Sequence, residues 1–181
     1  MEDRRKIRTK RVIKETFLDL LKEKEINKIS VAELADRADI GRGTFYLHYK
    51  DIYDLYEQFE NEIFDQLEVF YDNKILNSSF SNVEKFVELI IEYIFANKEI
   101  FQILIGSNKG IQNTNKFKEF FKKKEWELSK SINGEVSEYQ KVESAFTVAG
   151  VVSVLEEWVI EGMIISPDEL EKYLKKILLK F

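Results

Sequence analysis

Hydrophobic residues recur along most of the chain at the spacing that places them on one face of an α-helix. Near the N-terminus Ile13, Phe17, Leu20 and Leu21 stand at positions i, i+4, i+7 and i+8, which is the apolar stripe of an amphipathic helix. No segment alternates apolar and polar residues as a β-strand does. The pattern therefore predicts an all-α protein of about nine helices. The predicted helices span residues 4–25, 31–38, 42–49, 52–75, 82–96, 98–105, 115–132, 138–161 and 167–180.

The predicted helices begin at residues that commonly cap helix N-termini. Four sequences match the capping box, in which a Ser oxygen accepts from a free backbone N–H and a Glu or Gln three residues later reaches back. These boxes begin at Ser30, Ser81, Ser137 and Ser166, and Asp51 and Asn97 are further candidate caps. Pro167 stands at a first helical position, where its missing N–H is tolerated. Helices are expected to stop at Gly106, Gly134 and Gly162.

Composition narrows the class of protein further. The 181 residues are 44% hydrophobic and include 7 Gly, 1 Pro and no Cys. So few turn residues disfavour a β protein, and the lack of Cys excludes disulfides and thiolate metal sites, as fits a reducing cytoplasm. The N-terminus has no apolar signal core, and the longest apolar run, residues 146–155, has about half the length of a membrane span. We expect a cytoplasmic protein with no membrane segment.

The charge is distributed unevenly along the chain. Residues 1–50 contain 13 Lys and Arg against 9 Asp and Glu, whereas residues 51–181 contain 15 against 24. The net charges are therefore +4 and −9, which account for the total of −5. A basic N-terminal third on an acidic remainder indicates a polyanion-binding head on a body with another task. A solvated basic helix face is the alternative interpretation.

The first three predicted helices have the layout of a helix–turn–helix. The second and third are joined by the tight turn at residues 39–41, and in this motif the second of the paired helices lies in the DNA major groove. On the third helix Phe45 and Tyr49 are one turn apart and face the core, which leaves Gly43 and Leu47 pointing outward. We therefore place the domain boundary at residue 51, with a DNA-binding head before it.

The segment IGRGTFYLHYK, residues 40–50, carries hydrogen-bond donors and rings but no acid. A guanidinium suits guanine edges or phosphate, hydroxyls and an imidazole suit phosphates and base edges, and leucine suits a thymine methyl. A glycine lets the backbone approach the duplex closely. The predicted DNA contacts in this segment are Arg42, Gly43, Thr44, Tyr46, Leu47, His48 and Lys50. Ordinary exposed residues of a small helical subdomain are the alternative.

The stretch ISVAELADRADIGRGTFYLHYKDIYDLYEQF, residues 29–59, resembles the N-terminal domain of the TetR/AcrR family of transcriptional regulators. The A-x-x-A spacing of the second helix and the G-T-F-Y core carry the resemblance. It implies an all-α homodimer that binds double-stranded operator DNA through paired heads. It also implies DNA contacts from Ser30, Val31 and the basic arm that holds Arg5. Family members often have Ser where Gly41 stands, so the third helix lacks a side-chain cap here.

Residues 52–181 are predicted to form a helical ligand-binding and dimerisation domain. The segment from Ala145 to Leu155 is apolar almost all round, so we expect it to be buried on two sides, one of them against a second copy of the chain. The candidate dimer residues are Ala149, Gly150, Trp158 and Tyr173. The candidate ligand residues are Phe95, Phe101, Phe121 and Trp126, for which ordinary core packing is the alternative.

Two modes of regulation remain open at this point. The favoured hypothesis is a repressor that a small-molecule effector releases from its operator. The alternative is a regulator, possibly an activator, controlled by a protein that docks on the body, because the body resembles the subgroup of the dihydroxyacetone kinase operon activator, which responds to a protein partner. An enzyme is disfavoured, since the sequence has no metal-ligand cluster, no Gly-rich phosphate loop and a single histidine. We expect no cofactor and no metal.

Overall fold

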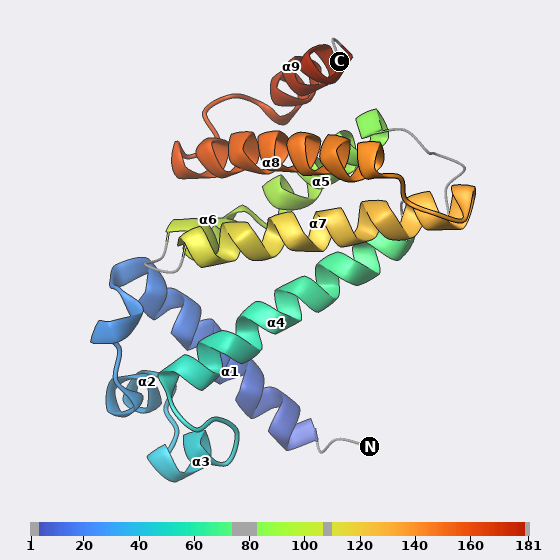
Figure 1. Cartoon of the computed structure of the whole chain (residues 1–181). Coiled ribbons are helices and arrows are strands. Elements are labelled where there is room, and N and C mark those ends of the chain that lie inside the picture. Colours follow the sequence, from blue (N-terminus) through green and yellow to red (C-terminus); the bar gives the residue numbers. More distant parts are fainter. Residues whose placement is uncertain (1–3, 74–82, 107–109, 180–181) are drawn as a thin grey trace. The chain divides into compact units, whose positions relative to one another are not determined.

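The computed structural model describes residues 4–73, 83–106 and 110–179, and all the regular structure in these ranges is helical (Figure 1). The predicted all-α fold with an N-terminal helix–turn–helix is confirmed. The elements are α1 Arg4–Glu23, the 3₁₀ turn η1 Ile26–Lys28, α2 Val31–Arg37, α3 Arg42–Tyr46, α4 Ile52–Tyr71, α5 Val83–Ala96, α6 Lys98–Gly106, α7 Gly110–Asn133, α8 Glu138–Ile160 and α9 Pro167–Leu178.

Most of the predicted helix boundaries agree with the structure within a few residues, and the largest difference is the start of α7. This helix begins at Gly110, whereas the sequence predicted a loop over residues 107–114, of which 107–109 lie outside the described residues. The polar side chains at 112–114 favoured a loop. Their helix propensity is lower than that of alanine by well under 1 kcal/mol each, which a long packed helix easily overrides.

Three of the four predicted capping boxes can be checked, and all three place their serine at a helix start. Ser30 and Ser166 accept backbone N–H groups of their helices at 3.1 and 3.3 Å, and Ser137 forms the full reciprocal box with Gln140. The box at Ser81 starts outside the described residues. Asn97 directly precedes α6, and its carbonyl accepts the Phe101 N–H at 3.2 Å, while its side-chain amide donates to the Tyr93 carbonyl of α5.

The chain divides into two compact units, residues 1–69 and residues 70–181. In the first unit α1, α2, α3 and most of α4 enclose a core that includes Phe17, Leu34, Phe45 and Tyr56. The Phe17 and Tyr56 rings meet edge to face with centroids 6.5 Å apart. The predicted functional boundary at residue 51 stays a prediction, whereas the compact units divide within α4.

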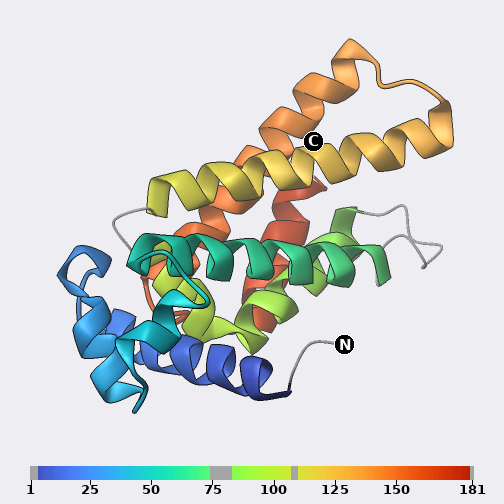
Figure 2. The ribbon, with the colours of Figure 1, turned by 90° about the horizontal axis from the view of Figure 1, so that it is seen from below.

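The second unit is a helical bundle in which α7 and α8 form a long antiparallel hairpin, seen from below in Figure 2. The helix α6 packs against both of them, and α9 packs on α5. The buried side chains between these helices are aliphatic and aromatic, and they include Ile91, Phe101, Leu104, Phe121 and Leu155. Both helices of the hairpin therefore contribute to one apolar core.

Candidate nucleic-acid interface

The turn between α2 and α3 is set by an aspartate in the left-handed conformation. Asp39 has φ 52°, a conformation that Asp tolerates better than most residues. The Ile40 N–H then donates to the Ala35 carbonyl at 2.9 Å, which closes the end of α2. Gly41 stands at the N-cap of α3 without a side-chain hydrogen bond, as the sequence predicted. This turn fixes the direction in which α3 leaves α2.

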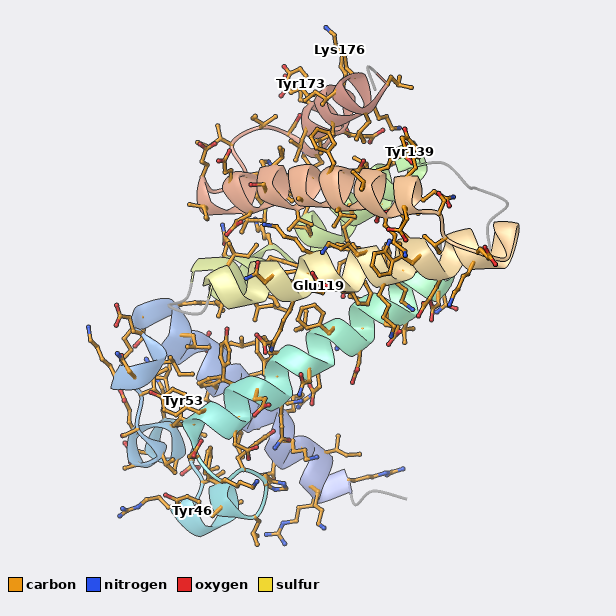
Figure 3. The ribbon with its side chains drawn as sticks, viewed as in Figure 1. Tyr46, Tyr53, Glu119, Tyr139, Tyr173 and Lys176 are labelled. Atoms are coloured by element: carbon orange, nitrogen blue, oxygen red, sulfur yellow. The ribbon has the colours of Figure 1, made fainter. Side chains whose placement is uncertain are left out.

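The helix α3 buries one side and exposes the other, as the sequence predicted. Phe45 is fully buried and Tyr49 is 2% exposed, and their ring centroids lie 5.6 Å apart. On the outer side Tyr46 is 57% exposed and Leu47 is 81% exposed. The Tyr46 ring meets the buried Phe45 ring edge to face, with centroids 5.6 Å apart, whereas Leu47 extends into water. Figure 3 shows Tyr46 projecting from α3.

The other predicted contact residues lie on the same short segment or at helix starts of the head. Arg42, Gly43 and Lys50 are exposed, whereas Thr44 and His48 are half-buried. At the start of α2 Ser30 is exposed and Val31 is half-buried, and Arg5 is exposed in the first turn of α1. A Cβ added at Gly43 would meet no atom of the protein within 4 Å. The fold itself therefore does not require a glycine at this position.

Several acids of the head are paired with cations. Arg37 donates two hydrogen bonds to Glu23, at 2.9 and 2.6 Å, and the hydrogen bond from Arg37 lowers the pKa of the Glu23 carboxyl. Lys24 contacts Glu33 at 2.5 Å, and Lys14 pairs with Glu62. These pairs neutralise carboxylates near the base-rich segments, which favours the approach of a polyanion.

The junction between α3 and α4 is held by two aspartates. Asp54 accepts from the Lys50 backbone N–H at 2.7 Å, and its own N–H donates to Asp51 at 2.8 Å. The backbone hydrogen bond from Lys50 lowers the pKa of Asp54. This reciprocal arrangement caps α4 and leaves the Lys50 side chain exposed beside α3.

Tyr49 has a buried hydroxyl that makes no hydrogen bond among the described residues. Burial, followed by the charges of Glu62 and Asp54, raises its pKa to about 12. Removing a buried hydroxyl that has no partner relieves a desolvation penalty. We therefore expect Tyr49→Phe to raise the free energy of unfolding by about 1 kcal/mol, measured by chemical denaturation. A loss of stability would show that the hydroxyl has a partner in solution.

The four candidate ligand residues do not surround one cavity. Phe101 and Phe121 line a small apolar cavity of about 20 Å³ between α5, α6, α7 and α8, together with Phe117. Phe95 instead stacks on Trp158, with centroids 6.2 Å apart, and Trp126 lies at a separate pocket near the end of α7. The shared cavity has room for about one water molecule, so it does not accommodate a small-molecule effector in this conformation.

The candidate dimer residues also divide between surface and core. Gly150 is exposed, Ala149 is half-buried, and Tyr173 is 49% exposed on α9. Trp158 is 3% exposed, and its indole N–H donates to the Ile165 carbonyl at 2.7 Å. Contrary to the expectation, Trp158 is therefore a core residue of its own bundle and offers no surface to a second copy.

The exposed face of α8 carries apolar residues that the sequence reasoning did not single out. Tyr139, Val142, Phe146 and Ile160 are between 63% and 73% exposed. With Gly150 they form a stripe at spacings of three, four, four and ten residues, which follows one side of the helix. Their neighbours on the buried side are equally apolar, so the pattern alone did not separate the two sides.

No helix among the described residues is both long and apolar enough to span a bilayer. Nor does any group of three or more His, Asp or Glu side chains in the described ranges have the arrangement of a metal site.

The fold and the exposed face of α3 define an all-α regulator with a helix–turn–helix head. Residues 15–59 match the family model of bacterial regulatory proteins of the tetR family, and residues 81–180 match the model of a transcriptional regulator C-terminal region. The chain belongs to the TetR family of transcriptional regulators. This is a family of DNA-binding regulators and not of enzymes, and its members bind operator DNA as dimers.

Three proteins illustrate the similarity. An uncharacterized HTH-type transcriptional regulator, YxbF of Bacillus subtilis, is 26% identical over 118 residues, which are 61% of this chain and 28% of that protein. The chain thus spans less than a third of the length of that relative. The structure of NalD, the secondary repressor of the MexAB-OprM multidrug efflux pump in Pseudomonas aeruginosa, has a TM-score of 0.70 at 15% identity and covers 97% of this chain and 96% of its own. The dihydroxyacetone kinase operon activator DhaS has a TM-score of 0.63 at 20% identity, covering 96% of both chains.

Proposed function

We propose that this protein is a dimeric regulator that recognises a specific operator through the outer face of α3. The observation that carries the proposal is the exposure of Tyr46 and Leu47 beside Arg42 and Lys50 on a face without acids. Apolar and cationic groups together suit base edges, thymine methyls and phosphates. The segment is short, and its position is fixed by Phe45 and the Asp39 turn. Because chromosomal DNA is the proposed partner, the cytoplasm is the expected location.

We assign dimerisation to the exposed stripe of α8 together with the exposed face of α9. Figure 3 shows Tyr139 on α8 and Tyr173 on α9 directed away from the bundle. Gly150 lies midway along the α8 stripe, and a Cβ there would meet open space within the chain. A glycine at the middle of an apolar stripe permits a second helix to approach closely across a two-fold axis. The proposed interface is therefore self-complementary and centred near Gly150.

We propose that the protein is a repressor and that an effector releases it from its operator. The similar folds belong to a named repressor and a named activator, so the fold itself is compatible with both signs. The cavity of about 20 Å³ between α5 and α8 is far below the 300–1,000 Å³ that is typical of small-molecule sites. This size favours an effector that binds elsewhere on the body. Control by a docking protein is the second candidate, and the same observation supports it.

Gly43 offers a test in which stability and DNA binding are expected to change in opposite directions. Gly43→Ala adds a Cβ that meets nothing in the protein and should stabilise the helix by about 0.5–1 kcal/mol. On DNA the same methyl group would separate the α3 backbone from the duplex, and we expect about tenfold weaker operator binding. The operator is a duplex that the purified protein selects from random DNA.

Fluorescence anisotropy at fixed salt measures the affinity of the Gly43→Ala protein, and chemical denaturation measures its stability. The stability measurement serves as the internal control, because a more stable protein that binds less tightly cannot have lost its fold. Equal affinity of the two proteins would show that the α3 backbone does not approach the duplex at this position.

A further inference from the structure

The corner between α7 and α8 encloses a surface pocket that takes no part in the proposed DNA reader. Figure 2 shows this corner at the far end of the α7–α8 hairpin. The pocket has a volume of about 510 Å³, which lies in the range of small-molecule sites. It is lined by Lys123, Trp126, Glu127 and Lys130 of α7, by the turn at Gly134, Glu135 and Val136, and by Lys141 of α8.

The backbone at this corner is held by specific hydrogen bonds. Gly134 adopts φ 77°, which favours glycine, and its N–H donates to the Lys130 carbonyl at 2.9 Å. Immediately afterwards Ser137 and Gln140 form a capping box that fixes the start of α8. The start of α8 is therefore capped by its own side chains, and the Gly134 conformation determines how the chain leaves α7.

The side chains that line the pocket combine an aromatic surface with positive charge. Trp126 is 37% exposed, although Trp is usually highly buried, and no hydrogen bond of its indole is found among the described residues. Lys123 and Lys141 are positioned by Glu127 at 3.8 Å and Glu138 at 2.6 Å. Lys130 forms no ion pair within the described part of the chain. An aromatic wall beside ammonium groups suits a flat apolar molecule that carries an acidic group.

We propose that this pocket binds a small aromatic anion, such as an aromatic carboxylate or sulfonate. The ring lies against Trp126, and the acidic group is held by Lys130 with help from Lys123 and Lys141. The surrounding segment, residues 51–181, is acidic, with 15 basic against 24 acidic residues. The lining also holds Glu127 and Glu135, and Lys123 and Lys141 are paired with Glu127 and Glu138. The ammonium of Lys130 is therefore the charge that favours an anionic aromatic molecule over a cationic one.

An ion-pair chain links the pocket to the end of α4, the helix that leads out of the head. Glu127 lines the pocket and lies 3.8 Å from the ammonium of Lys124. Lys124 is 4% exposed and pairs with Asp72, directly after α4, at 3.0 Å, and it also lies over the Tyr71 ring at 5.6 Å. An anion that draws Lys123 away from Glu127 changes the charge beside this buried pair. Any effect of this anion on DNA binding rests on the proposed function, whereas binding of the anion to the pocket does not.

The test uses the full chain and the fluorescent aromatic anion anilinonaphthalene sulfonate, titrated in the absence of DNA. We expect Lys130→Glu and Trp126→Leu each to weaken its binding about tenfold, because they remove the charge and the ring surface. Lys98→Glu changes a lysine that is exposed at the start of α6 and forms no ion pair among the described residues. It is the matched control and should keep the affinity within about twofold. Thermal unfolding confirms that each variant is folded.

A second probe separates charge recognition from general hydrophobic binding. Phenylnaphthylamine has similar rings without the sulfonate, and Lys130→Glu should leave its binding nearly unchanged. Unaltered binding of the sulfonate to both pocket variants would overturn the proposal, as would an equal loss of both probes in Lys130→Glu. Since no DNA is present, these outcomes are independent of whether the protein reads an operator.

Discussion

Arg42→Ala and Tyr46→Ala are each expected to lower operator affinity by about five- to a hundredfold, and the double substitution by more than either alone. Arg42 is exposed at the start of α3, and Tyr46 is 57% exposed one turn later. A specific side-chain contact to a base edge contributes about 1–3 kcal/mol, which corresponds to roughly five- to a hundredfold in affinity. Fluorescence anisotropy with the selected operator at fixed salt measures the change.

The matched control for Tyr46→Ala is Tyr53→Ala. Tyr53 is 50% exposed on α4, outside α3, and Figure 3 shows it apart from Tyr46. The loss of side-chain surface is the same in both proteins, so only the position differs. Both should remain dimeric by light scattering, and only Tyr46→Ala should bind weakly. If both α3 variants bind operator normally, α3 is not the reading helix.

Phe146→Glu is expected to convert the dimer into a monomer and to lower operator affinity about a hundredfold or more. Phe146 is 65% exposed on the α8 stripe, and a carboxylate there would be buried without a partner across the two-fold axis. Two linked heads bind far more tightly than one, typically by factors of about 10²–10⁴. Light scattering measures the mass, and anisotropy measures the affinity.

Val69→Glu is the control for Phe146→Glu, because it introduces the same charge at another exposed apolar residue. Val69 is 59% exposed on α4 and is not one of the residues of the proposed α8 interface. This variant should stay dimeric and bind operator normally. A Phe146→Glu protein that remains dimeric would exclude the α8 stripe as the interface, whatever its affinity for DNA.

The sequence predicted the head well because its signals there are local. Ser30 and Asp51 mark helix starts through side-chain caps, and the spacing of Phe45 and Tyr49 determines which side of α3 is buried. Once these two side chains are buried, the helical period of α3 determines which residues point outward. The exposed positions of Arg42, Gly43, Tyr46 and Leu47 follow from the same geometry, so they needed no knowledge of distant contacts.

The body was predicted less completely, because its packing depends on contacts between distant segments. The helix α8 is apolar on nearly all sides, so its sequence gives no direction for the core, and Trp158 is buried where a dimer contact was expected. Aromatic residues on α5, α6 and α7 could not be assigned to a common cavity from helical spacing alone. Only the arrangement of helices separates Phe101 and Phe121 from Trp126.

If a dimer reads DNA with two copies of α3, selection of binding sites from random duplexes will reveal both half-sites. Purified protein is incubated with random duplex DNA at one moderate salt concentration, because phosphate contacts make affinity strongly salt-dependent. The bound duplexes are then sequenced over successive rounds. We expect an inverted repeat whose half-sites lie about one helical turn, or a multiple of it, apart. If no motif is enriched, or only a single half-site without a repeat, then the protein does not read DNA as a dimer with two copies of α3.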